Sequence, residues 1–186
     1  WLAEGGKDLP EEPPAYAAPD AAAASATVFG KSLKALVEQL NTGAPLERLW
    51  AILTLGLTGP PAHPVLVHAL SDWDSAVVYW AGVCLAHGES LPETAPEALQ
   101  TALNRSEATA RLGAAFALAR HGHPGPAEAV LIEAVGHANP YVRLLAVQCL
   151  EALGPRNGAI RHALQEATED TYHDVAKVAR HALQSA

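Results

Sequence analysis

The stretch HANPYVRLLAVQCLEALG, residues 137–154, decides the fold because its layout occurs more than once in the chain. The stretch DWDSAVVYWAGVCLAHG, residues 72–88, has Cys84 where the later stretch has Cys149. In both, apolar residues recur in steps of four after a turn that holds Asp or Asn. Steps of four keep side chains on one face of a helix, so each stretch predicts a helix with an apolar face. The recurrence indicates repeating architecture rather than a reactive centre that appears twice.

A regular period runs through the rest of the chain. Four prolines follow one another at intervals of 32, 32 and 31 residues: Pro60, Pro92, Pro124 and Pro155. Each aligned unit carries an alanine that is followed four residues later by a leucine. The aligned alanines are Ala51, Ala81, Ala114, Ala146 and Ala179. We interpret them as small residues that let neighbouring helices approach closely, while the leucines fill the layer beside them.

Each unit is long enough for two helices. The expected helices span 31–41, 45–57, 62–71, 74–87, 93–104, 107–121, 125–136, 139–153, 157–168 and 172–185. Gly88, Gly122 and Gly154 stand between units, where glycine suits a left-handed helix stop. One helical pair cannot bury its own apolar face, but stacked pairs can. The predicted fold is therefore an all-α α-solenoid of about five helical hairpins.

Residues 1–29 predict a flexible acidic arm or linker, and residues 30–186 predict the repeat domain. The arm is rich in Pro, Ala and acidic residues and has no apolar period. Two alternatives stay open: a disordered cut end, or an arm that Trp1 and Tyr16 pin onto a neighbouring domain. Because the first residue is Trp rather than Met, we expect a fragment or a processed product, and the missing signal peptide says little about compartment.

The charge and composition exclude several classes of partner. The net charge is −8, and residues 1–20 hold five acids against one lysine, so the remainder is mildly acidic. A nucleic-acid groove needs a basic stripe, and an anionic membrane surface attracts basic residues. No apolar run approaches the roughly 18–20 residues that a membrane span needs. We therefore expect neither nucleic acid nor membrane as a partner.

The repeated pattern resembles the HEAT and HEAT-like helical repeats. It reads as Leu or Val, six residues, Val with Arg, two residues, Ala, three residues and Leu, as in residues 135–150. The resemblance covers residues 30–186. It implies HEAT-like hairpins whose second helices line the concave face of the solenoid, and it implies little about function.

A narrower resemblance links the chain to the helical-repeat region at the C-terminus of certain bacterial sulfatases. The element V-x-Y-W-A at 77–81 and the closing V-A-x-x-A-x-x-A-L at 175–183 carry it. The sulfatase active site needs a C/S-x-P/A-S-R motif, whereas CLAHG and CLEAL here lack the arginine. The resemblance thus implies an accessory piece rather than the enzyme. It also implies a periplasmic or extracellular location; without that link, a cytoplasmic one is expected.

Neither the cysteines nor the histidines predict a reactive or metal centre. Cys84 and Cys149 fall late in their helices, where the helix dipole opposes thiolate formation, so we interpret them as buried small apolar residues. His87, His121 and His123 fall near the turns between units and are the candidate metal ligands. Zinc needs three or four converging ligands, and no third ligand is fixed here. We therefore favour solvated histidines and expect no cofactor.

Arginine recurs at one position of the repeat, as Arg48, Arg111 and Arg143. Two interpretations stay open. The arginines pair with an acid or a carbonyl of the adjoining unit, or they form a row that binds anionic groups of an acidic partner through bidentate contacts.

Aromatic residues gather in the first two units. Trp50 and Trp80 occupy equivalent positions, and Tyr79 precedes the second of them. One interpretation is packing between the first two repeats. The other is an aromatic patch for a protein or sugar partner, since aromatic anchors dominate many interfaces.

These observations predict a non-catalytic accessory or interaction domain and not an enzyme. The favoured hypothesis makes it the C-terminal part of a sulfatase-like hydrolase that packs on the adjacent catalytic domain. The alternative is a free-standing HEAT-repeat scaffold that binds a protein or peptide on its concave face.

Overall fold

The computed structural model describes residues 15–17 and 27–185. The described part contains ten α-helices. They are α1 (Leu33–Thr42), α2 (Pro45–Gly56), α3 (His63–Ala69), α4 (Ser75–His87), α5 (Ala95–Leu103), α6 (Ala108–Arg120), α7 (Gly125–Ala134), α8 (Pro140–Leu153), α9 (Gly158–Ala167) and α10 (His173–Gln184). Each begins and ends within two residues of the expected bounds. The all-α prediction is confirmed.

Two short elements complete the described fold. A 3₁₀ turn, η2 (Pro60–Ala62), leads into α3, and its two prolines occupy a position where the missing N–H is harmless. The strands β1 (Thr27–Val28) and β2 (Lys31–Ser32) form an antiparallel hairpin in which Thr27 pairs with Ser32. The hairpin precedes α1, and the Ser32 side chain caps that helix by accepting the N–H of Ala35.

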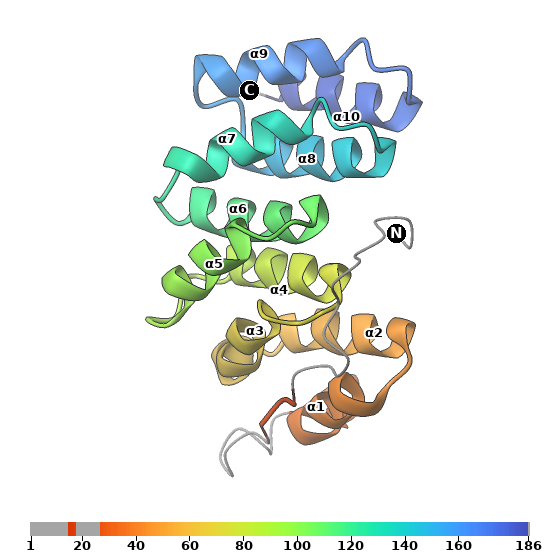
Figure 1. The fold of residues 1–186 in the computed structure, drawn as a ribbon, viewed down its shortest axis with the longest axis vertical. Helices are drawn as coiled ribbons and strands as arrows, with labels where there is room; N and C mark the ends of the chain where they lie inside the picture. The colour runs from red at the N-terminus through yellow and green to blue at the C-terminus, as the bar shows by residue number, and fades with distance from the viewer. Residues whose placement is uncertain (1–14, 18–26, 186) are drawn as a thin grey trace.

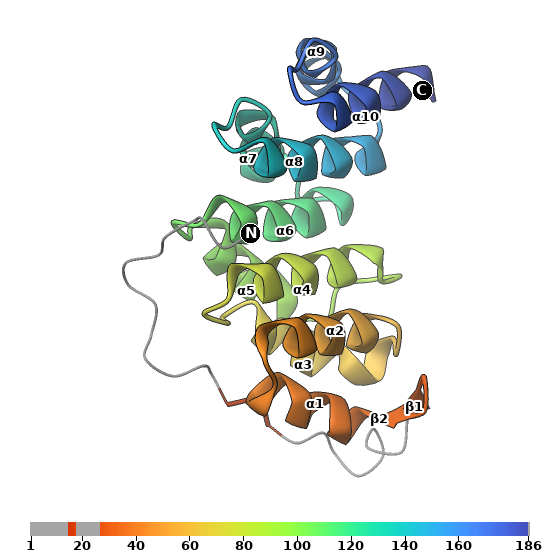
Figure 2. The ribbon, with the colours of Figure 1, turned by 90° about the vertical axis from the view of Figure 1, so that its right-hand side faces the viewer.

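The helices stack as hairpins along one axis (Figure 1). The second helices α2, α4, α6, α8 and α10 form a ladder on one side, with the first helices behind them (Figure 2). Figure 1 shows the stack bowing so that this ladder lies on its inner side. The solenoid of HEAT-like hairpins and the concave placement of the second helices are therefore as expected.

The aligned small residues lie in the core between second helices. Ala51, Ala81, Ala114, Ala146 and Ala179 are all 0% exposed. Two glycines bring α4 and α6 closest together. A Cβ added to Gly82 would lie 2.3 Å from the Gly113 carbonyl carbon. A Cβ added to Gly113 would lie 2.4 Å from the backbone carbonyl oxygen of Tyr79. No larger residue fits at this crossing.

The expected glycine stops are only partly confirmed. Gly122 and Gly154 have φ values of +87° and +77°, the left-handed conformation that favours glycine. Gly88 does not, because its φ of −63° and ψ of 155° are extended. The chain leaves α4 toward the long connection before α5 in an extended direction, so a left-handed stop is not needed there.

Candidate functional site

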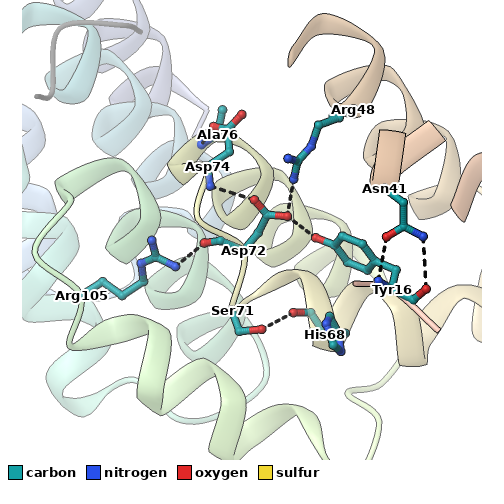
Figure 3. A network of polar contacts seen from close by, with 9 residues as sticks. All are labelled: Tyr16, Asn41, Arg48, His68, Ser71, Asp72, Asp74, Ala76 and Arg105. Atoms are coloured by element: carbon teal, nitrogen blue, oxygen red, sulfur yellow. Dashed lines mark hydrogen bonds and ion pairs between the residues drawn. The ribbon is translucent and has the colours of Figure 1, made fainter. Parts of the chain in front are cut away.

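Tyr16 occupies a pocket that four parts of the repeat domain build (Figure 3). The Asn41 side chain, at the end of α1, bonds to both polar backbone atoms of Tyr16. Its Oδ1 accepts the Tyr16 N–H at 2.8 Å, and its Nδ2 donates to the Tyr16 carbonyl at 3.2 Å. The Tyr16 ring is 5% exposed and lies 5.0 Å from the His68 ring of α3. We call this pocket, formed by Asn41, Arg48, His68 and Asp72, the Tyr16 site.

Asp72 forms the floor of the Tyr16 site and is 0% exposed. It lies in the turn between α3 and α4. Its Oδ2 accepts from the Tyr16 hydroxyl and from the Arg48 guanidinium, and its Oδ1 accepts the Asp74 N–H at 2.8 Å. Arg105, in the turn before α6, donates to the Asp72 carbonyl at 2.5 Å. Three successive units therefore converge on one buried aspartate.

The electrostatics of the site keep Tyr16 neutral. Burial and the adjacent Asp72 carboxylate raise the pKa of Tyr16 above its ordinary value of 10.0, and Arg48 offsets only part of this. Arg48 is 3% exposed, and its guanidinium carbon lies 5.0 Å from the centre of the Trp73 ring. A buried charge pair needs such surrounding partners, because desolvation opposes it. The Tyr16 site accordingly favours an uncharged hydroxyl donor.

A second candidate surface lies on α2. Leu46, Trp50, Leu53 and Leu57 follow one another in steps of four, three and four, so they share one helical face. Leu46, Trp50 and Leu57 are 65%, 61% and 66% exposed. We call these four residues the α2 stripe. Large exposed apolar patches on a soluble protein mark interaction sites.

The α2 stripe runs into a cavity of about 680 Å³ between α2, α3 and α4. Leu53 and Leu57 belong to both the stripe and the cavity wall, and Trp80 and Val83 of α4 form much of the opposite side. The Trp80 indole N–H is buried and has no hydrogen-bond partner among the described residues. A cavity of this size, mostly apolar with a few polar groups, fits the ordinary dimensions of a ligand or side-chain pocket.

The predicted aromatic residues thus have different environments. Trp50 is exposed on the α2 stripe, and Trp80 lines the cavity. Tyr79 is 4% exposed, and its ring lies edge-on to Trp80 at 5.1 Å. Burial and a hydrogen bond with the Cys149 thiol raise the pKa of Tyr79. Tyr79 therefore supports the core rather than the surface.

The three repeated arginines each contact an acid of the following unit. Arg48 forms an ion pair with Asp72. Arg143 of α8 donates two hydrogen bonds, of 2.7 and 2.9 Å, to the carboxylate of Asp170, which lies between α9 and α10. Arg111 lies 3.7 Å from Glu133 of α7. The guanidinium of Arg143 lowers the pKa of Asp170. Sequence analysis left two interpretations of these arginines open: pairing with the adjoining unit, or a row that binds an acidic partner. The structure contains the pairing with the adjoining unit.

The cysteines have the environment of small apolar residues. Cys149 is 3% exposed, and burial raises its pKa to about 12. Cys84 is partly buried against α2, where a Cβ on Gly56 would lie 2.3 Å from its Sγ. Burial raises the pKa of Cys84 to about 11. Neither thiol has the lowered pKa of a nucleophile.

The three histidines suggested as metal ligands each have a different environment. His121 Nε2 lies 3.1 Å from the Leu85 carbonyl, His87 stacks edge-on with Phe116 at 5.7 Å, and His123 is exposed. Among residues 15–17 and 27–185, no group of three or more His, Cys, Asp or Glu side chains is arranged to hold a metal ion. No helix in this part of the chain is both long and apolar enough to cross a membrane.

Sequence reasoning missed three members of the Tyr16 site. An asparagine or aspartate at a helix end, such as Asn41 or Asp72, has an ordinary role as a turn or cap residue, and nothing in the sequence distinguishes His68. Tyr16 itself was singled out as an anchor for the arm, but onto a neighbouring domain. The structure places it on the repeat domain of the same chain. Trp1, the other suggested anchor, lies outside the described residues.

Comparison with known proteins supports the repeat class. Residues 95–184 match the family model for HEAT repeats, which spans α5 to α10. No curated protein matches the chain. The match supports the resemblance to HEAT repeats and lends no support to the resemblance to sulfatases.

Proposed function

We propose that this HEAT-repeat solenoid is a non-catalytic docking module that binds an amphipathic helical segment of a protein partner at the α2 stripe. HEAT repeats commonly mediate protein interactions and are typically non-catalytic, and the match to α5–α10 supports this class of role. The single observation that carries the specific proposal is the exposed apolar face of Leu46, Trp50 and Leu57, which continues into the cavity.

The geometry favours a helix as the bound element. The α2 stripe runs over 12 residues, from Leu46 to Leu57, which is about 16 Å along the helix axis at 1.5 Å per residue. A partner helix of about three turns covers that length, and helix-in-groove recognition uses apolar anchors at the same spacing. The cavity between α2 and α4 accepts a large side chain of the partner.

Trp50 is the expected energetic centre of this surface. Tryptophan is enriched among the few residues that dominate binding energy, and truncating such a residue costs about 2 kcal/mol or more. Trp50 is exposed, yet its neighbours Leu46 and Leu57 are apolar, so a docked helix excludes water around it. Trp80, Leu145 and Val178 occupy the equivalent position on other second helices and are half-buried, whereas α6 has Gly113 there.

A photo-crosslinking amino acid placed at Trp50 tests the proposal. In the native host, we expect one partner peptide to be captured at this position, and the capture to be lost when Leu57→Glu is added. A crosslinker at Gln165, which is exposed on the first helix α9, is the matched control. A synthetic peptide of the captured segment should bind the wild-type chain and lose at least about 30-fold in affinity with Trp50→Ala. Equal capture at Gln165, or capture that Leu57→Glu leaves unchanged, overturns the proposal.

The sulfatase parent is a separate proposal that rests on the residues at 77–81 and 175–183 alone. In it, the docked partner is the adjacent catalytic domain of the same polypeptide. The coding region upstream of Trp1 tests it. A C/S-x-P/A-S-R motif with acidic metal ligands there supports this parentage, and a start codon just before the arm favours the free-standing scaffold.

A further inference from the structure

The segment around Tyr16 is held by the repeat domain as a peptide ligand is held. Asn41 bonds to both the N–H and the carbonyl of Tyr16, so the backbone is recognised whatever the neighbouring side chains are. Tyr16 is buried, whereas Ala15 and Ala17 on either side are exposed. This alternation is the pattern of an extended strand that inserts one side chain and turns its neighbours to solvent. One anchor and one backbone clamp make up the described contact.

The pocket is built by the repeat domain itself. Without Tyr16, Asp72 still accepts from Arg48 and from the Asp74 N–H, and Arg105 still fixes the Asp72 backbone. The residues that form the pocket come from α1, α2, α3 and the turn before α4, all of which belong to the stacked helices. Figure 3 shows them converging on the Tyr16 ring from several elements. The acceptor is therefore in position for any tyrosine hydroxyl that enters.

We propose that the Tyr16 site is a recognition site for extended peptide segments that carry an unmodified tyrosine, and that the chain's own arm occupies it in cis. A partner segment of the same chemistry enters when the arm leaves. This goes beyond the proposed function, because the site lies away from the α2 stripe and recognises a different kind of segment. The arm acts as a tethered competitor, and such tethers reach effective concentrations in the millimolar range.

The sequence around Tyr16 defines the ligand chemistry. It reads PPAYAAP at 13–19, with prolines on both sides and small residues next to the tyrosine. A residue before proline is biased toward extended backbone, which lowers the entropy lost on binding. The hydroxyl is required because Asp72 is a buried acceptor. A phosphorylated tyrosine is excluded, because its charge would face the Asp72 carboxylate without solvent.

The first test empties the site in the full chain with Tyr16→Ala and supplies a labelled peptide, PEEPPAYAAPDA, residues 10–21, in trans. Fluorescence anisotropy should show binding to this variant and at least about tenfold weaker binding to the wild-type chain, where the arm competes. The peptide with Phe for Tyr should bind about 10-fold to 100-fold more weakly, and the phosphotyrosine peptide should not bind. Asn41→Ala added to Tyr16→Ala should weaken binding, whereas Asn104→Ala, at an exposed asparagine that ends α5, should not.

Absence of binding to a Tyr16→Ala chain that keeps its helical circular dichroism overturns the proposal. So does equal binding of the Tyr and Phe peptides. A second variant covers the case in which Tyr16→Ala does not fold. A protease site inserted between Ala22 and Ala23 is cut after folding, and the tyrosine peptide in excess should then displace the cleaved arm. Retention of the arm against that excess overturns the proposal. Trp50→Ala should leave all of these results unchanged, which separates this site from the α2 stripe.

Discussion

The chain uses the same arginine–aspartate contact near both ends of the solenoid, and the two copies differ in their surroundings. Arg48 reaches Asp72 in the turn of the next unit, and Arg143 reaches Asp170 in the same way. Both aspartates also accept the N–H of the residue two positions later, at 2.8 and 2.7 Å. Only Asp72 carries a tyrosine from a distant segment. Asp72 is fully buried, whereas Asp170 keeps 10% of its side chain exposed.

This difference shows how one repeat pattern produces two surfaces. At the C-terminal end the contact ties neighbouring units together and stays in reach of water. At the N-terminal end an added segment closes over it and turns a structural contact into a binding pocket. Most of the large exposed apolar residues also lie at this end, since Phe29, Leu46, Trp50 and Leu57 come before α3, whereas Tyr141 lies on α8. Both proposed recognition sites therefore lie in the first two units.

The largest expected effect separates the two aspartates directly. Asp72→Ala leaves the Arg48 charge buried without its partner, and we expect a loss of about 3–5 kcal/mol in the free energy of unfolding. Asp170→Ala is the matched control, and its loss should be about 1–2 kcal/mol because Arg143 regains contact with water. Urea unfolding followed by circular dichroism measures both. Equal losses would show that burial by Tyr16 adds nothing to the N-terminal contact.

The junction between the two halves is the next most sensitive point. Gly113→Ala places a Cβ against the Tyr79 backbone and should destabilise the chain by about 1–3 kcal/mol through overpacking of α4 on α6. Gly125→Ala is the control, because no atom lies within 4 Å of a Cβ at that position. Thermal unfolding of the two variants measures the difference. A Gly113→Ala chain as stable as the control would contradict the close approach of these helices.

The stability of the chain at alkaline pH tests the burial of the Tyr16 hydroxyl. Its pKa is raised in the folded chain, so the folded state holds a proton that the unfolded state releases near pH 10. Stability from this group is complete below pH 10 and falls as pH rises above it. Tyr16→Phe should remove part of this fall between about pH 10 and 11, and the remainder includes Tyr79, Cys84 and Cys149, whose pKa values burial raises as well. An identical pH dependence of wild type and Tyr16→Phe in urea unfolding would place the Tyr16 hydroxyl in water.

The smallest expected effect concerns the α2 stripe. Trp50→Ala should change the free energy of unfolding by no more than about 0.5 kcal/mol, because the side chain is largely exposed in the free chain. Leu55→Ala, on the buried face of the same helix, should cost about 2–5 kcal/mol. A large loss for Trp50→Ala would mean that the stripe stabilises the chain itself and would remove the argument for docking.

The sequence by itself determined the helices, their pairing and their stacking. Steps of four residues fix an apolar face, and a period near 32 residues fixes the unit, because both depend only on local geometry and nearest neighbours. The buried alanines from Ala51 to Ala179 follow from that register. The same reasoning identified Trp50 and Trp80 as a pair, but not that one would be exposed and the other would line a cavity.

Only the tertiary structure decided the Tyr16 site. Tyr16 bonds to Asn41, 25 residues later in the sequence, and to Asp72, 56 residues later. No period relates an arm residue to a turn two units away, and each of these residues has an ordinary local explanation alone. The close crossing of α4 and α6 at Gly82 and Gly113 could not be predicted either, because a glycine within a helix does not indicate which other element packs against it. The contacts of the repeat follow from local geometry that recurs in every unit. The Tyr16 site depends on residues far apart in the sequence that come together at one place only.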